Sequence, residues 1–588
     1  MLLSPLVSLT LAPAGLLQWF DEAPVRYWAI AWSTWSVLLL FTFLRLGVDW
    51  HPAGRLWRCI PHWVLYPRTF ALVAVVAMLA FRWPVLFAGP MRNPDETQLG
   101  AGAMTYWRDP VPWRSVDMHT SGPINAYFLW PALLFDGRID YIGLRLAALF
   151  AHGAAALACY GLLRRFTSDG IARLGTLPLL DFVAFNSVWE FVQYSSEQAS
   201  FCLLALAAWL LADACTLTND RESTRHWRLI VAGLCLGCLP FAKAQAVGLG
   251  LTLGCFGLVA AWSVPVAPRG LRIRRALALA IGAFLPAGIF LVWVALYGQG
   301  AQAYISYIES NRVYVAGHVE DRLKLLRDFY AFFVDIDFVF KPFFLGSLGL
   351  AMAVTLIGSL VRPLSRKLLW GAWLLVAVGL WTVIYPGRIF WHYLHFLVLP
   401  LAWLSGLSLA AGFRLAEMKV PARWSAHVRW GIVTAVVVLI LVPQILTRVH
   451  DLPVVGTLAE GQRNSVHPVS RRLRELARPG DTLVVWGWAP QFYTESGLTQ
   501  GVRDAQAEPE IAPGPMNLFY RNRMMWDIRK HPPALFVDAI ADGGFIYTAH
   551  SLFGLQIFPE LATFVAGHYH LVEDLNGYRI YVHNNRAP

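Results

Sequence analysis

Residues 69–123 read TFALVAVVAMLAFRWPVLFAGPMRNPDETQLGAGAMTYWRDPVPWRSVDMHTSGP. The first part, 69–90, is an apolar run long enough to cross a lipid bilayer. The second part, 91–123, is a loop that is dense in ionisable residues: Asp95, Glu96, Asp109, Asp117, His119, Arg92, Arg108 and Arg114. Such side chains are costly beside a membrane unless they face water or a ligand. The loop is therefore predicted to be a functional site at a membrane exit.

The composition extends this reading to the whole chain. Of its 588 residues, 57% are hydrophobic and only 14% are charged, and apolar runs of transmembrane length recur. The net charge of +11 comes from basic residues in short loops between those runs, and no nucleic-acid-binding motif accompanies them. A polytopic α-helical membrane protein is predicted, and nucleic acid is excluded as a partner.

About thirteen spans are predicted from the apolar runs. They are 2–20, 27–48, 69–90, 141–163, 171–192, 199–217, 229–239 with its continuation, 246–266, 276–297, 343–361, 369–385, 392–412 and 430–447. We expect an extra N-terminal membrane region at 1–68 and a membrane core at 69–447 with long loops at 91–140 and 298–342. A soluble α/β domain is expected at 448–588.

Lys and Arg are concentrated in alternate short loops, which predicts that those loops face the cytoplasm. The opposite set contains the loops 91–140 and 298–342, the turns near Glu197, Lys243 and Arg388, and everything after residue 447. Both long loops are therefore expected on the same side of the membrane as the C-terminal domain.

The C-terminal region has the pattern of a small α/β domain. DTLVVW at 481–486 and the run at 534–537 are predicted strands, and 516–530 is a predicted helix. Two alternating runs flank Asn576 and Gly577, which indicates a β-hairpin.

Several ionisable residues have both a structural and a functional interpretation. Asp95 follows Pro94, so it could help to cap the helix expected at 97–107, or act as a base. Lys243 lies in the middle of an apolar segment, where its side chain either extends to the membrane interface or binds an anion. Arg388, His392 and Tyr393 form either an interfacial belt or an anion site. Glu197 is another acid at the same membrane face.

The loop 298–342 has an amphipathic pattern. An interfacial helix is its plain interpretation. The functional alternative is a lid over a lipid-borne substrate, with Arg312 as its phosphate contact.

Three short motifs carry a family resemblance: NPDETQLGAGA at 93–103, LPFAKAQAV at 239–247 and PGRIFWHYLHFLVLP at 386–400. Together with the span count, the long first loop and the C-terminal domain, they resemble the GT-C superfamily of glycosyltransferases. Within it, the chain is similar to the protein-mannosyltransferase-like group, which includes the lipid A aminoarabinose transferase. The resemblance implies a GT-C type fold with about 11–13 transmembrane helices and a C-terminal periplasmic α/β domain.

The resemblance also implies an inverting transfer of a sugar from a polyprenyl-phosphate donor. Asp95 would be the base. Lys243 and Arg388 would bind the leaving phosphate, with Arg114, His392, Tyr393 and Arg312 as further candidates. Glu96, Asp117 and His119 would orient the acceptor, tune Asp95 or hold a divalent metal ion, and the accessory acid would be Asp117 or Asp109.

The acceptor implied is an envelope glycan, lipid or protein at the periplasmic face of a bacterial inner membrane, and the sugar a hexose or pentose. Two alternatives stay open. An O-antigen-ligase-like transferase would rely on Arg and His in the long loop instead of Asp95. A transporter or flippase of lipid-linked sugars would use the charged residues along a translocation path, although the sequence has no repeat symmetry of the kind such transporters show.

Overall fold

The computed structural model describes residues 18–20, 22–50, 59–86, 93–134, 136–216, 222–262, 268–316, 319–335, 339–358, 364–450 and 466–586. Within these ranges, ten helical segments are long and apolar enough to cross a membrane. In the figures they are α3 (Pro24–Trp50), α6 (Pro67–Leu86), α10 (Tyr141–Leu163), α13 (Ser196–Thr216), α15 (Val247–Trp262), α16 (Arg269–Leu296), α20 (Phe340–Gly358), α21 (Leu364–Ile384), α22 (His395–Lys419) and α23 (Ala422–Val436), which continues through η7 (Val437–Leu441) into α24 (Val442–His450). The chain is a multi-pass membrane protein.

The difference between ten spans and the thirteen expected has a simple origin. Two predicted spans form α11 (Asp169–Phe185) and α14 (Glu222–Cys238), helices of 17 residues each that are not among the ten segments. Both still pack inside the bundle, where α11 is buried along nearly its whole length. The third, 2–20, lies almost entirely outside the described residues.

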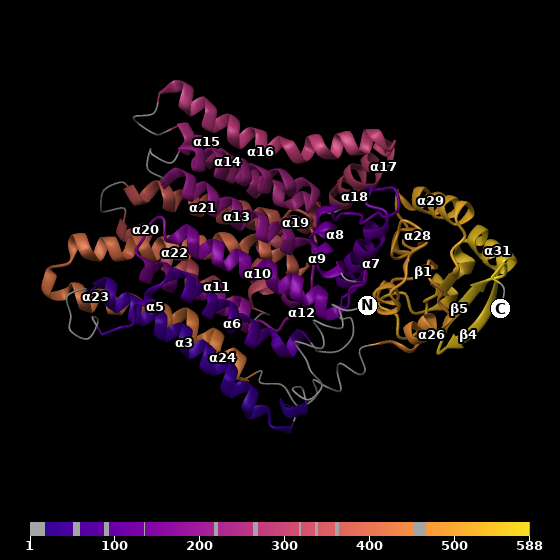
Figure 1. Cartoon of the computed structure of the whole chain (residues 1–588), viewed down its shortest axis with the longest axis horizontal. Helices are drawn as coiled ribbons and strands as arrows, with labels where there is room; N and C mark the ends of the chain where they lie inside the picture. The colour runs from indigo at the N-terminus through magenta and orange to yellow at the C-terminus, as the bar shows by residue number, and fades with distance from the viewer. Residues whose placement is uncertain are drawn as a thin grey trace.

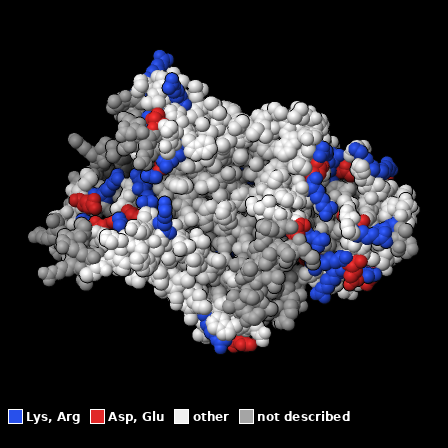
Figure 2. Space-filling model, in the orientation of Figure 1, with Lys and Arg blue, Asp and Glu red and all other residues white. Residues whose placement is uncertain are grey.

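The long helices run side by side along the molecule, and the C-terminal sheet lies at one end of the bundle (Figure 1). Figure 2 shows charged side chains gathered toward the two ends of the face in view. Among the described residues, the broad band between them shows few charged side chains apart from a small group at its lower edge. This distribution is the one expected for a bundle whose middle lies in hydrocarbon.

Close helix packing in the bundle depends on small residues. A Cβ atom on Gly233 of α14 would lie 2.3 Å from the Leu279 carbonyl oxygen of α16, and one on Gly282 would lie 2.1 Å from the Ile230 oxygen. Only glycine permits this approach, which is how membrane helices gain van der Waals contact without a hydrophobic driving force between them. At the centre, α22 is buried along its whole apolar stretch.

Short helices cluster at the end of the bundle that carries the sheet (Figure 1). The loop after α6 forms α7 (Pro94–Arg108), α8 (Ile124–Phe128) and α9 (Trp130–Leu133), where a helix at 97–107 was expected. The other short elements are α5 (His62–Leu65), α12 (Trp189–Val192), η2 (Leu239–Phe241), η3 (Ala244–Ala246), α17 (Gly300–Ala303), η4 (Tyr304–Glu309), α18 (Ser310–Ala316), α19 (Val319–Arg327), η5 (Tyr330–Val334) and η6 (Trp391–Leu394).

The C-terminal region contains a five-stranded sheet in the order β2-β1-β3-β5-β4. The predicted strands are β1 (Thr482–Trp486) and β3 (Leu535–Asp538), which pair in parallel, and the predicted helix is α29 (Asn517–Lys530). The predicted hairpin is β4 (Tyr569–Leu575) and β5 (Tyr578–His583), with positive φ at Asn576 and Gly577 as a tight two-residue turn requires. The remaining elements are β2 (Thr499–Gln500), α26 (Pro468–Leu476), α27 (Gln491–Ser496), α28 (Glu508–Ile511), α30 (His550–Phe553), η9 (Leu555–Ile557) and α31 (Pro559–His568).

The sheet and the loop after α6 share one hydrophobic core. Leu99 and Met104 of α7 belong to the same buried cluster as Leu483 and Val485 of β1. The C-terminal region is therefore docked firmly on the loop that carries Asp95. We propose the same domain boundaries as before: an N-terminal membrane region up to residue 68, a membrane core up to residue 447 and a C-terminal domain after it.

Candidate active site

The start of α7 is organised around Asn93. Its Oδ1 accepts a hydrogen bond from the backbone N–H of Asp95 at 3.0 Å, and Pro94 begins the helix. Asn93 is therefore the N-cap, and Pro94 stands where a missing N–H costs nothing. The capping interpretation of Asp95 does not hold for its side chain, because only its backbone takes part.

The Asp95 carboxyl is half-buried, and no hydrogen bond or ion pair to it occurs within the described part of the chain. Burial raises the pKa of Asp95 above its ordinary value of 3.8, while the charges of His392 and Lys243 offset part of this rise. Glu190 and Glu197 raise it further. A carboxyl group with a raised pKa and no partner has the properties of a general base.

Glu190, on α12, joins η6, the short helix that leads into α22, to the N-cap of α7. Its Oε2 accepts a hydrogen bond from the backbone N–H of His392 at 3.3 Å and pairs with the Nδ1 atom of that ring. Its Oε1 accepts a bond from Asn93 Nδ2 at 3.0 Å. Burial alone would raise the pKa of Glu190, but the charge of His392 and these hydrogen bonds bring it below its ordinary value.

Sequence reasoning did not single out Glu190. The available signal was an acid near the membrane exit on the same predicted side as Asp95, in the run WEFVQYSSEQ.

Lys243 enters the same region from the turn between η2 and η3. Its Nζ lies 3.1 Å from Glu197 Oε1 and donates to Ser196 Oγ at 2.9 Å. It also stands 5.7 Å from the centre of the Tyr393 ring. The residue is only 6% exposed, so it does not extend to an aqueous interface. An ammonium group has three N–H donors, and one of them is left for a ligand.

The loop after α6 holds the Lys243 turn in place. Ser121 pairs with Lys243 in an antiparallel bridge, and the Gly122 N–H donates to the Ala242 oxygen at 2.9 Å. A Cβ atom on Gly122 would lie 2.0 Å from the Phe241 carbonyl oxygen, so this contact requires glycine. The two motifs that carry Asp95 and Lys243 thus form one packed unit.

Arg388 supplies a third cation. Its guanidinium lies over the Tyr314 ring, 5.4 Å from the ring centre, and the Tyr314 hydroxyl is 2.9 Å from that of Tyr393. The Nε atom of Arg388 is buried without a hydrogen-bond partner, and no ion pair to this arginine occurs among the residues described. Buried donors of this kind are normally satisfied, so this nitrogen is available to an anion, although the charge of Arg388 also acts on the half-buried Glu508.

Glu96 has a structural role instead of the predicted catalytic one. Its two carboxylate oxygens lie 3.2 and 3.4 Å from Nε and Nη2 of Arg145 on α10, and both side chains are fully buried. Arg145 also donates to the carbonyl oxygens of Val85 and Leu86 at the end of α6. The pair therefore fastens α7 to the bundle, and Glu96 is not available to the reaction.

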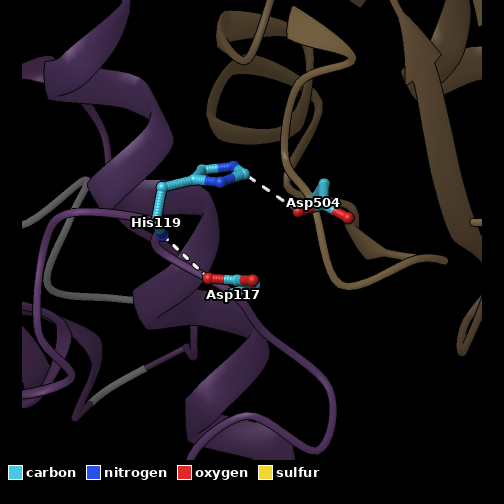
Figure 3. Close-up of side chains that lie close together, drawn as sticks. All are labelled: Asp117, His119 and Asp504. Carbon is cyan, nitrogen blue, oxygen red and sulfur yellow. Dashed lines mark hydrogen bonds and ion pairs between the residues drawn. The ribbon is translucent and has the colours of Figure 1, made fainter. Parts of the chain in front are cut away.

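Asp117 and His119 belong to a second cluster, at the junction with the C-terminal region. Figure 3 shows the His119 ring directed at Asp504, with Nε2 3.4 Å from Oδ1, and Asp117 below the His119 backbone. Asp117 Oδ1 accepts the His119 N–H at 2.8 Å, and the Asp117 N–H donates to the Arg503 oxygen at 2.8 Å. Within the described part of the chain, neither Asp117 nor His119 forms a hydrogen bond or an ion pair with Asp95. Their predicted roles beside Asp95 are not supported.

Holding a divalent ion was one of the roles expected for Asp117 and His119, together with Glu96. Asp117, His119 and Asp504 bring donor atoms within 4.8 Å of one another, a set that Zn²⁺ or Mn²⁺ accepts. However, Arg523 Nη1 lies 2.7 Å from Asp117 Oδ2, and its Nη2 lies 2.7 Å from Asp504 Oδ1. Although burial alone would raise the pKa of Asp117, the charges of Arg523 and His119 bring it below its ordinary value. The guanidinium already supplies the cation, so the residues fit a metal only if Arg523 moves.

Two predicted phosphate binders form ion pairs elsewhere. Arg114 pairs with Asp109, its Nε donating at 2.9 Å, and is 43% exposed, which also removes Asp109 as the accessory acid. Arg312 pairs with Glu309 at 2.7 Å and is 66% exposed. Since Tyr314 faces Tyr393, a residue two positions earlier on α18 faces away. Arg92 lies outside the described residues.

Comparison with known proteins identifies the fold. No family model and no curated protein matches the chain. The crystal structure of ArnT from Cupriavidus metallidurans bound to undecaprenyl phosphate matches with a TM-score of 0.56 and 13% identity, over 89% of this chain and 100% of that one. The structure of the same ArnT in the apo state gives a TM-score of 0.45 at 13% identity, over 88% and 98%.

The Archaeoglobus fulgidus oligosaccharyltransferase AglB, in complex with an inhibitory peptide and a dolichol-phosphate, gives a TM-score of 0.43 at 11% identity, over 89% and 75%. Of these three structures, only the ArnT bound to undecaprenyl phosphate has a TM-score above 0.5. At 13% identity this similarity shows a shared fold. The chain has the GT-C type fold predicted from its sequence.

Proposed function

We propose that this chain, which has the fold of ArnT, is an inverting glycosyltransferase that takes its sugar from a polyprenyl-phosphate donor. One observation carries the proposal. In the described part of the chain the Asp95 carboxyl has no hydrogen-bond or ion-pair partner, and the charges of His392 and Lys243 act on it. Arg388 adds a third cation: it lies over the ring of Tyr314, whose hydroxyl is 2.9 Å from that of Tyr393, and its Nε atom is buried without a hydrogen-bond partner. The ArnT structure with this fold binds undecaprenyl phosphate, which is the leaving group this arrangement suits.

Asp95 is the proposed base. An oxygen or nitrogen nucleophile of the acceptor attacks the anomeric carbon from the face opposite the phosphate, and its proton passes to the Asp95 carboxylate. The new glycosidic bond forms as the bond from the anomeric carbon to the phosphate oxygen breaks, so the configuration inverts. The raised pKa of Asp95 makes it a stronger base than an exposed aspartate.

The leaving polyprenyl phosphate takes the electron pair of the broken bond, and the cations stabilise that charge. Lys243 offers its remaining N–H, and Arg388 offers a guanidinium that lies over the Tyr314 ring. Fixed cations in a site with little water stabilise a developing charge most strongly. His392 is oriented by Glu190, and Tyr393 by its bond to Tyr314.

We further propose that the site faces the periplasm of a bacterial inner membrane. The Lys- and Arg-rich loops at the opposite end of the bundle favour this orientation. The acceptor would then be an envelope glycan, lipid or protein. The C-terminal region lies close to this site, since Tyr520 of α29 bonds to Ser310 of α18, the helix that carries Tyr314.

The test is a panel of synthetic polyprenyl-phosphate hexoses and pentoses with purified full-length protein in detergent. We expect release of polyprenyl phosphate with one donor and formation of a glycosylated acceptor of inverted anomeric configuration. An Arg388→Gln variant tests the role of the cations and is expected to release the lipid phosphate at least 100-fold more slowly than the wild type. If the protein instead moves lipid-linked sugar across vesicles without any turnover, the transporter alternative replaces this proposal.

A further inference from the structure

A second polar pocket lies at the other end of the bundle from Asp95. It is a cavity of about 390 Å³ between the C-terminal end of α3, the loop from α10 to α11 and the C-terminal half of α22. Its lining includes Trp50, Arg165, Ser168, Phe413, Arg414 and Glu417. The volume is in the range of small-ligand sites, and nothing in the proposed reaction uses it.

The surroundings of the pocket carry more positive than negative charge. Asp169 alone pairs with three arginines, Arg45, Arg164 and Arg173, at 2.9 to 3.4 Å. Asp213 pairs with both Arg165 and Arg228. Asp49, in the wall, is already engaged by Arg45 at 3.0 Å and by the Gly170 N–H at 2.7 Å. Glu417 is exposed and forms no ion pair within the described chain, while the three aspartates are each shared. The six arginines Arg45, Arg164, Arg165, Arg173, Arg228 and Arg414 outnumber the four carboxylates Asp49, Asp169, Asp213 and Glu417, so positive charge remains in excess.

Donors with free capacity point to an anionic ligand. Trp50 Nε1 is buried and has no acceptor in the described chain. Arg414 uses one nitrogen, which donates to the Phe166 oxygen at 2.7 Å, and is otherwise exposed. Ser168 precedes α11 as its N-cap and makes no side-chain cap bond, so its hydroxyl is available to a ligand, while the Gly170 N–H at the same helix end is already bonded to Asp49.

The walls identify the kind of anion. The rings of Trp50 and Phe413 pack against each other on one side, tilted by 48° with 5.4 Å between their centres, and α3 and α22 are both membrane-crossing helices. A basic pocket between transmembrane helices beside an aromatic wall is the site that anionic lipid headgroups occupy. We propose that this pocket binds the phosphate-bearing headgroup of an anionic phospholipid.

The test uses delipidated full-length protein in detergent, titrated with dioctanoyl phosphatidylglycerol and followed by native mass spectrometry and thermal unfolding. We expect one tightly bound lipid and a rise in melting temperature. Arg414→Gln should weaken this binding about 10-fold or more, because a charge-assisted contact to the phosphate is lost. Trp50→Phe, which removes the indole N–H and keeps an aromatic ring, should weaken it several-fold.

The matched control is Arg274→Gln, the same change of charge at an exposed arginine near the start of α16. It should bind the lipid like the wild type. Equal binding by Arg414→Gln and the control would overturn the proposal, as would equal binding of dioctanoyl phosphatidylcholine. If inorganic phosphate alone stabilises the protein as much as the lipid does, the assignment to a lipid is wrong.

Discussion

Replacing Asp95 by Asn separates the proposed chemistry from the fold. The N-cap of α7 uses the backbone N–H of Asp95 and the side chain of Asn93, so the substitution leaves the cap bond intact. The side chain has no hydrogen-bond partner in the described chain that the amide would lose. The variant is therefore expected to fold and to melt within a few degrees of the wild type.

Its activity should fall steeply. A positioned general base contributes roughly 100- to 10,000-fold to a rate, which corresponds to about 3–5 kcal/mol of transition-state stabilisation. Removing the negative charge also strengthens the field of Lys243 and His392 on an anion. The loss should hence appear in kcat, while the KM for the donor stays equal or decreases.

The assay is steady-state release of polyprenyl phosphate from the donor found by the panel, with melting temperature as the measure of folding. Asp542→Asn, the same substitution at an exposed aspartate of the C-terminal region, is the control and should retain full activity. A folded Asp95→Asn protein with kcat within 10-fold of the wild type would refute the assignment of the base. The ligase-like alternative, centred on Arg and His, would then be favoured.

Four further outcomes are expected. Because burial raises the pKa of Asp95, its base form is lost as the pH falls through that raised value, so kcat/KM should decline on the acid side above pH 3.8 in the wild type; a profile without this limb contradicts the assignment. Lys243→Gln should lower the rate about 100-fold and also destabilise the protein, since it leaves Glu197 buried without its cation; adding Glu197→Gln should restore the melting temperature but not the rate. Glu96→Gln should cost about 3–5 kcal/mol of stability, seen as a lower melting temperature, with kcat of the remaining folded protein unchanged. A chelator should leave turnover unchanged, because Arg523 supplies the cation of the second cluster; inhibition reversed by Mn²⁺ would show otherwise.

The local sequence was sufficient to predict a structural feature where the physical cause of that feature lies within a few neighbouring residues. Apolar runs of bilayer length predicted the long helices, since a backbone in lipid must satisfy its hydrogen bonds within the segment. Pro94 predicted a helix boundary, although α7 begins at Pro94 and not at the expected residue 97, and Asn576 with Gly577 predicted the hairpin, because both constrain the backbone directly. The short motifs around Asp95, Lys243 and Arg388 also named residues that the structure brings to the same end of the bundle.

Only the tertiary structure distinguished Asp95 from Glu96. The two acids are neighbours in sequence, but the helical turn directs one to the cations and the other to Arg145, 49 positions later in the chain. Glu190 joined the site for the same reason, through contact with a histidine 202 positions away. Asp117 was assigned beside Asp95 because it lies in the same loop, yet its partner Arg523 comes from the C-terminal region.

The sequence by itself therefore determined most of the membrane helices and the ionisable residues that the membrane makes costly, and the membrane face of each loop stays a prediction. The tertiary structure decided which of those residues are paired and which are free. Pairing depends on distances of about 3 Å between groups far apart in the chain, and a carboxylate or guanidinium is available for chemistry only when no such partner is present.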